Sequence, residues 1–153
     1  MKLTFISVGK QNDSDIKDAL LDYTKRISRY FPVEWKLISP ACAGRTSDKN
    51  KEGEMILKGL DSGDFVVVLD DKCKEMTTEE LAEFIEKRMS ASDKRIVFII
   101  GGAYGFSEDV YKRANFKWSL SKLTFPHQLV RLILSESVYR AISVIKKEPY
   151  HHK

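Results

Sequence analysis

Two short apolar runs constrain the fold more than any other feature of the sequence. Residues Phe65–Leu69 read Phe-Val-Val-Val-Leu, and residues Ile96–Ile100 read Ile-Val-Phe-Ile-Ile. A strand with one face in water alternates apolar and polar side chains, whereas a parallel strand covered by helices on both faces stays apolar throughout. We therefore predict that both runs are central strands of a mostly parallel sheet in an α/β fold.

The rest of the chain alternates further strand and helix patterns. We expect strands at Leu3–Val8 and Glu34–Ile38, a helix capped by Ser14 that ends before Phe31 and Pro32, a helix opened by Ser47 or Asp48 that ends near Gly59, and a helix opened by Thr77 or Thr78 that reaches Met89. The stretch Ser39–Asn50, including Gly44, Arg45, Thr46 and Ser47, is expected to be a mobile loop. Because no repeat, low-complexity tract or flexible linker divides the chain, residues 1–153 are expected to form a single domain.

The composition is typical of a soluble protein. Hydrophobic residues make up 42% of the chain, but no apolar run is long enough to cross a membrane. The N-terminus lacks the pattern of a secretory signal, so a cytosolic location is predicted. Cys42 and Cys73 are expected to be free thiols, and no metal site is predicted from the spacing of metal-ligating residues. The formal charge of +4 permits a polyanionic partner without indicating one by itself.

A glycine-rich loop, Gly101–Phe106, directly follows the second central strand, and Ser107 then caps a helix that starts with Glu108 and Asp109. Loops at the carboxyl ends of parallel strands bind ligands in open α/β sheets, although a glycine pair also fits a tight turn. Neither the dinucleotide-binding glycine fingerprint nor the phosphate-binding P-loop is present. Since two carboxylates at the helix start repel phosphate, the loop suits a cofactor without phosphate groups.

The last third of the chain combines a loop pattern with an unusually apolar helix. Residues Trp118–His127 mix hydroxyl and apolar side chains, which suits the binding of an adenine ring and also fits a short strand with a turn. The helix expected from Gln128 to Lys147 is apolar on most sides, so it is either a central core helix or half of a homodimer interface, and the short chain favours the dimer. Glu136 and Arg140 have the spacing of a helix-surface ion pair, and a substrate contact fits them equally well. Residues Lys146–Lys153 are typical of a frayed, solvated terminus.

Several motifs, taken in order, resemble those of a known family. They are Ile-Ile-Gly-Gly-Ala-Tyr-Gly-Phe at 99–106, Trp-Ser-Leu-Ser-Lys-Leu-Thr-Phe-Pro-His at 118–127, Leu-Val-Arg at 129–131, Glu-Ser-Val-Tyr-Arg-Ala at 136–141 and Pro-Tyr-His at 149–151. The initial Met-Lys-Leu and the Val-Gly pair that ends the first strand extend the likeness over essentially the whole chain. The chain resembles the ribosomal large-subunit pseudouridine N3-methyltransferases of the SPOUT class.

The resemblance implies a specific fold and a specific cofactor. It implies a SPOUT-type α/β fold in a homodimer, with a C-terminal trefoil knot and the cofactor site within about residues 65–153. Knots are exceptional in proteins, so no composition predicts one. The cofactor is S-adenosylmethionine. The residues that the resemblance assigns to it are Leu69, Gly101, Leu120, Ser121, Lys122, Leu123, Thr124 and Phe125.

The reaction that the resemblance implies is methylation of N3 of a pseudouridine in large-subunit (23S) ribosomal RNA, on the assembled ribosome. Methyl transfer from a sulfonium is an in-line displacement that needs no metal, so the enzyme mainly positions and desolvates the reactants. The imide N3 is protonated near neutral pH, so a base or a stabiliser of the developing anion is required. The catalytic candidates are His127, Arg140, Tyr150 and His151. We favour Arg140, which stabilises an anion without accepting a proton, while His127 suits proton transfer.

Arg131, His152 and Lys153 are assigned to RNA binding. Family members commonly end Pro-Tyr-His-Arg, whereas His152 stands here where the arginine is expected. Either Lys153 or His152 supplies the terminal cation, or that contact is dispensable. Two alternatives remain: a noncatalytic ribosome-binding factor, which the intact cofactor segments disfavour, and a SPOUT enzyme acting on transfer RNA, which the closing Pro-Tyr-His and the lack of an added RNA-binding domain disfavour.

Overall fold

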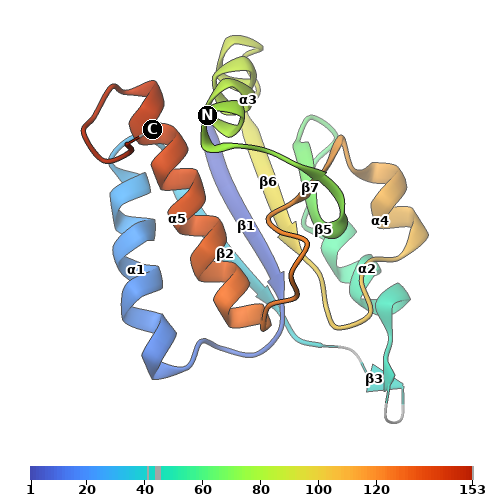
Figure 1. Ribbon diagram of the computed structural model, residues 1–153. Helices are drawn as coiled ribbons and strands as arrows, with labels where there is room; N and C mark the ends of the chain where they lie inside the picture. The colour runs from blue at the N-terminus through green and yellow to red at the C-terminus, as the bar shows by residue number, and fades with distance from the viewer. Residues whose placement is uncertain (41, 44–45, 153) are drawn as a thin grey trace.

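The protein is built around one twisted parallel sheet. The structure, a computed structural model, describes residues 1–40, 42–43 and 46–152. Its strands are β1 (Lys2–Val8), β2 (Val33–Ile38), β5 (Phe65–Glu75), β6 (Arg95–Ile100) and β7 (Phe116–Ser119), which pair in the order β2-β1-β6-β5-β7, and the short antiparallel pair β3 (Cys42–Ala43) and β4 (Thr46–Ser47). The helices are α1 (Ser14–Ser28), α2 (Lys49–Lys58), α3 (Thr78–Ser90), α4 (Glu108–Arg113) and α5 (His127–Ile145) (Figure 1).

Helices cover both faces of the sheet. On β6, Ile96, Phe98 and Ile100 pack with α1, α3 and α5, whereas Val97 and Ile99 pack with α2 and α4. All five side chains are buried, with exposed fractions of 3% or less. The prediction that the two apolar runs are interior parallel strands is therefore confirmed, because β6 and β5 each have a strand on both sides.

Local sequence signals set most helix starts. Asp48, Thr77 and Ser107 accept backbone hydrogen bonds at the starts of α2, α3 and α4, and Thr77 with Glu80 forms a complete capping box. The expected Ser14 cap is wrong, because Ser14 is already helical and Asp13 occupies the cap position. The Asp13 side chain makes no capping bond; instead its amide donates to Gln128 Oε1 across 2.6 Å.

Only part of the stretch from residue 39 to residue 50, which we expected to be a loop, lacks regular structure. Thr46–Ser47 form β4, and α2 begins at Lys49, because the Asp48 carboxylate accepts from the amides of the first turn. Gly44 and Arg45 lie outside the described residues. Among the described residues, no helix is long and apolar enough to cross a membrane.

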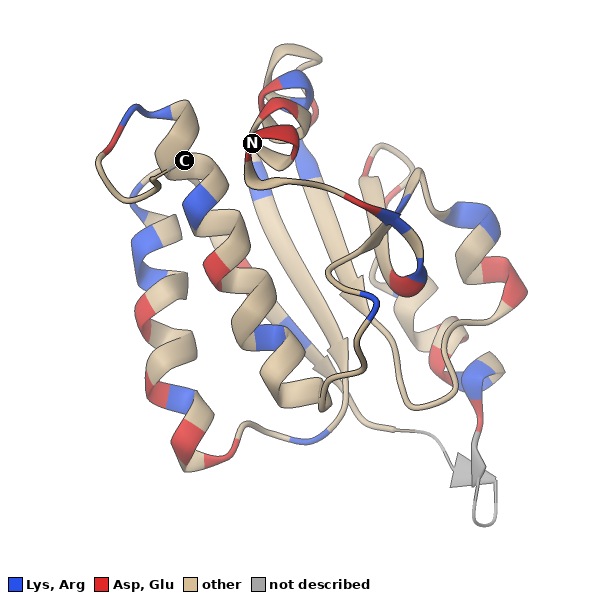
Figure 2. Cartoon of the chain, viewed as in Figure 1, with Lys and Arg blue, Asp and Glu red and all other residues tan. Residues whose placement is uncertain are grey.

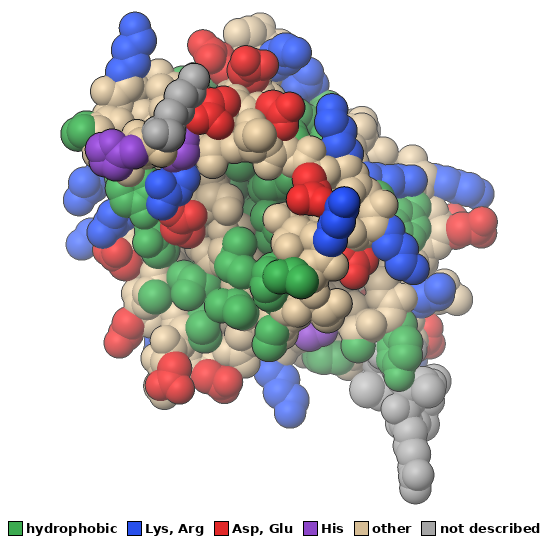
Figure 3. All heavy atoms as spheres, viewed as in Figure 1, with side chains coloured by type: hydrophobic (Ala, Val, Ile, Leu, Met, Phe, Trp, Pro, Cys, Tyr) green, Lys and Arg blue, Asp and Glu red, His purple; other side chains and the backbone are tan. Residues whose placement is uncertain are grey.

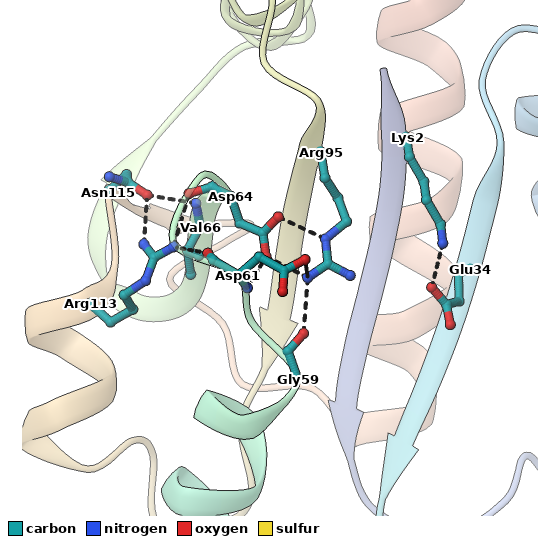
Figure 4. Close-up of polar contacts among 9 residues, drawn as sticks. All are labelled: Lys2, Glu34, Gly59, Asp61, Asp64, Val66, Arg95, Arg113 and Asn115. Carbon is teal, nitrogen blue, oxygen red and sulfur yellow. Dashed lines mark hydrogen bonds and ion pairs between the residues drawn. The ribbon is translucent and has the colours of Figure 1, made fainter.

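A polar network fastens the amino ends of the central strands (Figure 4). Arg95 at the start of β6 forms an ion pair with Asp64 and donates to the Gly59 carbonyl across 2.9 Å. Arg113 donates to the carbonyls of Asp61 and Asp64, so the turns before β5 and β7 share one anchor. Burial alone would raise the pKa of Asp64, but its hydrogen bonds, chiefly from Arg95, hold that pKa below the ordinary value. Lys2 and Glu34 join β1 to β2 in a more exposed ion pair, 2.8 Å apart, which contributes little to the stability of the fold.

Replacing Asp64 with Ala is expected to lower the free energy of unfolding by about 3 kcal/mol, because it leaves the Arg95 guanidinium buried without its partner. The native pKa of Asp64 is depressed, so its contribution is present above the unfolded value, near 3.8, and is lost as the pH falls through the native pKa. Urea unfolding should therefore show a difference in the free energy of unfolding between the wild type and the variant at pH 7. This difference should become smaller below pH 4. Asp61→Ala is the control: its side chain is 87% exposed and lies 3.9 Å from Arg95, so a loss above 0.5 kcal/mol there, or none at Asp64, would contradict the assignment.

Candidate active site

A cavity of about 410 Å³ lies beside the bulge of β5, at the ends of β6 and β7, where α5 begins. Open α/β sheets bind ligands outside the carboxyl ends of their strands, where loops leave the sheet. We call it the loop cavity. Its wall consists of Leu69, Asp70, Asp71, Ile100, Gly101, Gly102, Ala103, Gly105, Phe106, Tyr111, Leu120, Ser121, Leu123, Thr124, Phe125, His127 and Val130. The volume and the mixture of apolar side chains with a few polar groups are typical of a small-molecule site.

The glycine loop forms one wall through its backbone. A Cβ atom at Gly101 would lie 3.0 Å from the Phe106 ring, and one at Gly102 would lie 2.7 Å from Glu52 Oε1. Gly105 has a φ of +81°, a region that side chains rarely adopt, and its amide donates to the Gly102 carbonyl. The glycines therefore serve close packing and a turn, and the same turn exposes backbone to the cavity.

The loop that follows β7 forms the opposite wall. Seven of the eight residues predicted to bind the cofactor line the loop cavity, and the eighth, Lys122, lies in the same loop without lining it. Ser121 braces this loop, because its carbonyl accepts from Ser119 Oγ across 2.9 Å and its hydroxyl accepts from the Leu123 amide across 3.0 Å. The segment therefore combines the two predicted alternatives: it begins as a short strand, β7, and continues as a shaped loop.

Sequence reasoning missed an acid pair that also lines the loop cavity. Asp70 and Asp71 follow the apolar run of β5, where the strand bulges between Leu69 and Lys74. Tyr111 donates its hydroxyl to Asp70 Oδ2 across 2.7 Å. The signal was available, since the reasoning that selected Gly101 at the end of one central strand applies equally to the residue after Leu69.

Three predicted catalytic residues meet at the other end of α5. Arg140 donates twice to Glu136 Oε1, at 2.9 and 2.5 Å, and these bonds raise the pKa of Arg140. Its guanidinium lies 4.7 Å from the centre of the Tyr150 ring, and Tyr150 also donates to Glu136 across 3.2 Å. We call Glu136, Arg140, Tyr150 and His151 the tail cluster. The expectation of a frayed terminus is wrong for Tyr150 and His151, because both side chains are half-buried and hydrogen-bonded.

The tail cluster engages both ring nitrogens of His151. Its Nδ1 lies 3.4 Å from Arg140 Nη1, and its Nε2 lies 3.0 Å from Glu79 Oε1. A guanidinium only donates, so Nδ1 accepts and the proton resides on Nε2, which donates to Glu79. Both ring nitrogens are therefore engaged within the protomer. His151 in this arrangement orients Arg140 and is not free to act as a base.

The predicted catalytic residues do not form one site within a protomer. His127, at the start of α5, lines the loop cavity, whereas Arg140 lies 13 residues further along the same helix. At 1.5 Å per residue, the two side chains are about 20 Å apart along the axis. One chain therefore presents half of the expected constellation at each end of α5.

The assignment of Arg131 to RNA binding is wrong, because its side chain is fully buried and cannot contact RNA. Its guanidinium donates across 2.8 Å to Ser7 Oγ, to the Lys10 carbonyl and to Asn12 Oδ1. These three acceptors fasten the start of α5 to the loop after β1. His152 is exposed, and Lys153 lies outside the described residues. Within residues 1–40, 42–43 and 46–152, no three His, Cys, Asp or Glu side chains gather as a metal-binding group.

Comparison with known proteins gives concordant matches. A family profile described as "Predicted SPOUT methyltransferase" matches residues 1–151. The chain is 43% identical to a Christiangramia forsetii protein and 44% identical to a Parabacteroides distasonis protein, both named ribosomal RNA large subunit methyltransferase H, over the full length of each chain. A solved structure, the tRNA (m1G37) methyltransferase from Aquifex aeolicus, matches with a TM-score of 0.56 and 17% identity, covering 100% of this chain and 76% of that one. The likeness to that structure concerns the fold alone.

Arg131→Lys is expected to lower the free energy of unfolding by about 2 kcal/mol, because an ammonium group cannot reach the three acceptors that the guanidinium joins. Urea denaturation measures this loss. Arg29→Lys, at the exposed position that directly follows α1, makes the same substitution and should change stability by less than about 0.5 kcal/mol. Equal stability of the two variants would show that Arg131 does not hold α5 to the loop.

Proposed function

The chain belongs to the SPOUT methyltransferase family and is a methyltransferase, and from this premise we propose that it methylates N3 of a pseudouridine in large-subunit ribosomal RNA with S-adenosylmethionine as donor. The observation that carries the proposal is that seven of the positions that the resemblance assigns to the cofactor line one cavity. They come from three segments of the chain, namely β5 just before its bulge, the end of β6 and the loop after β7, and only the fold brings them together.

The loop cavity fits the proposed donor. Apolar side chains such as Leu69, Ile100 and Phe125 suit the faces of an adenine ring, and backbone groups of the two loops suit its edge. The wall offers carboxylates and no Lys or Arg among the described residues, which suits a molecule that bears positive charge and no phosphate. When bound, S-adenosylmethionine supplies a methyl group made electrophilic by its sulfonium.

The chain's own residues supply the rest of the chemistry. The N3 proton of the pseudouridine must leave, and the anion that develops must be stabilised. His127 lines the loop cavity, so it is the candidate to take or relay that proton. Arg140 keeps its charge, held by Glu136, and stabilises the imide anion electrostatically. Tyr150 and His151 orient Arg140.

We propose that a second copy of the chain brings these two halves together. The outward stripe of α5 is apolar at its start, with Leu129 and Ile133, and polar further on, with Glu136 and Arg140. Leu123, in the loop before α5, is 69% exposed. Figure 3 shows hydrophobic side chains gathered on this face of the molecule, and Figure 2 shows the charges of α5. Packing of two such surfaces would bring the tail cluster of one protomer to the loop cavity of its partner.

Further features follow the family and remain proposals. We propose that residues 1–153 form one SPOUT domain with a trefoil knot within about residues 65–153, and that the enzyme acts in the cytosol on the assembled large subunit. His152 and Lys153 are proposed RNA contacts at the dimer cleft. Transfer RNA is the second candidate substrate, and a noncatalytic ribosome-binding role is the third.

The proposed activity is tested by incubating the protein and labelled S-adenosylmethionine with ribosomes, free ribosomal RNA and transfer RNA, all from cells that lack the enzyme. We expect one labelled nucleotide, an N3-methylated pseudouridine in the large-subunit RNA of ribosomes, identified by nuclease mapping and mass spectrometry. Label found in transfer RNA instead would show that transfer RNA is the substrate. Calorimetry that detects no binding of S-adenosylmethionine would favour the binding factor.

The dimer is tested by sedimentation. The wild type is expected at twice the chain mass of 17.6 kDa, and Ile133→Asp, which places a charge on the outward apolar stripe of α5, is expected at the mass of one chain. Leu21→Asp provides the matched control, because Leu21 is 57% exposed on α1 and the substitution is the same in kind. A wild type that sediments as one chain at all concentrations would overturn the proposed assembly.

A further inference from the structure

The charge of the loop cavity is one-sided. Among the described residues that line it, the carboxylates are Asp70 and Asp71. The remaining titratable side chains of the lining are Tyr111 and His127. Lys72 and Lys122, the basic residues next to the wall residues in the sequence, do not line it. A small cavity with carboxylates and no fixed cation prefers a positively charged ligand to a neutral one of the same shape.

Asp70 is held more firmly than its neighbour. The Tyr111 hydroxyl bonds its Oδ2 across 2.7 Å, and the Lys72 amide bonds its Oδ1 across 3.0 Å. Asp70 is half-buried, whereas Asp71 is exposed. Solvent and salt screen an exposed carboxylate, so Asp70 exerts the larger part of the field inside the cavity.

The ionisation of this pair is consistent with that role. Burial alone would raise the pKa of Asp70, but the Lys72 amide and the Tyr111 hydroxyl hold it below the ordinary value. Burial and the Asp70 carboxylate raise the pKa of Tyr111 to about 12. At neutral pH a protonated phenol therefore donates to an ionised carboxylate, and the negative charge stays in place.

We infer that Asp70, oriented by Tyr111, is the specificity-determining residue by which the loop cavity selects the cationic sulfonium donor over its neutral thioether product. The inference rests on the proposed function, because it assigns a task within the proposed cofactor site. Transfer breaks the S–CH3 bond and forms the N3–CH3 bond; the sulfur keeps the electron pair, and the N3 proton passes to a base. The charge of the cofactor falls by one, so its attraction to Asp70 weakens once the methyl group has left.

This selection favours turnover. Product that binds as tightly as the donor blocks the cavity, so release is a common limit on turnover. An attraction that weakens with the chemistry favours exchange of the product for fresh donor. The preference should also decline in high salt, because charge interactions at a partly exposed site are screened.

The test compares dissociation constants for S-adenosylmethionine and S-adenosylhomocysteine by calorimetry at 0.05 and 0.5 M salt. The wild type is expected to prefer the donor, and Asp70→Asn to lower the product-to-donor ratio of dissociation constants by about tenfold. The asparagine keeps an acceptor for the Lys72 amide, so the bulge should persist, and thermal unfolding checks this. Tyr111→Phe should change the ratio in the same direction by a smaller factor.

Asp71→Asn is the matched control, since it removes the same charge from the exposed neighbour and should change the ratio less than twofold. A loss of affinity for both molecules by the same factor in Asp70→Asn would overturn the inference while leaving the proposed function intact. The same holds for a ratio that responds to Asp71 and not to Asp70. A wild type that binds neither molecule would overturn the proposed function, and the inference with it.

Discussion

The stiffness of α5 governs how the candidate active site is distributed. A helix of 19 residues holds its first residue, His127, and its fourteenth, Arg140, at a fixed separation of about 20 Å. The loop cavity lies at one end and the tail cluster at the other. No rotation of side chains closes that distance, so the proposed function requires that the two halves meet across an interface between two copies. The apolar start of the outward stripe of α5 is the surface proposed for that interface.

Two arginines hold this arrangement in place from opposite ends of the central strands. Arg95 ties the amino ends of β5 and β6 through Asp64, and Arg131 ties the start of α5 to the loop after β1. Both guanidinium groups are largely withdrawn from water, and each joins segments distant in sequence. Because α5 begins beside the loop cavity, the Arg131 contacts also fix where His127 and Val130 stand in its wall.

Periodicity and turn chemistry were sufficient for the sheet and for most helices. The apolar runs of β5 and β6 identify interior parallel strands because that pattern has one common physical cause, and Thr77 with Glu80 forms the expected type of cap. The cap at Asp13 was missed because both Asp13 and Ser14 are good cap residues, and the Gln128 contact to the Asp13 amide involves a residue 115 positions away.

The family motifs predicted which residues line the loop cavity but not the role of every charged residue. Arg131 lies within the Leu-Val-Arg motif and was assigned to RNA, because nothing local to it indicates that Ser7, 124 residues earlier, receives its hydrogen bond. Asp70 carries no motif, and its contact with Tyr111 depends on how a bulge in β5 meets α4. Tertiary contacts of this kind decide whether a charged side chain faces water, a ligand or the core.

The most direct test of the shared active site is a mixed dimer. One protomer carries Arg140→Ala, and the other carries Gly101→Val, whose side chain would crowd the Phe106 ring beside the loop cavity. Each homodimer of a variant is expected to be inactive. Purified through two different tags, the mixed dimer has one intact cavity facing one intact tail, so the account predicts about half of the wild-type methylation per dimer. If each protomer completes its own site, both sites of the mixed dimer are damaged, and absence of activity would contradict the account.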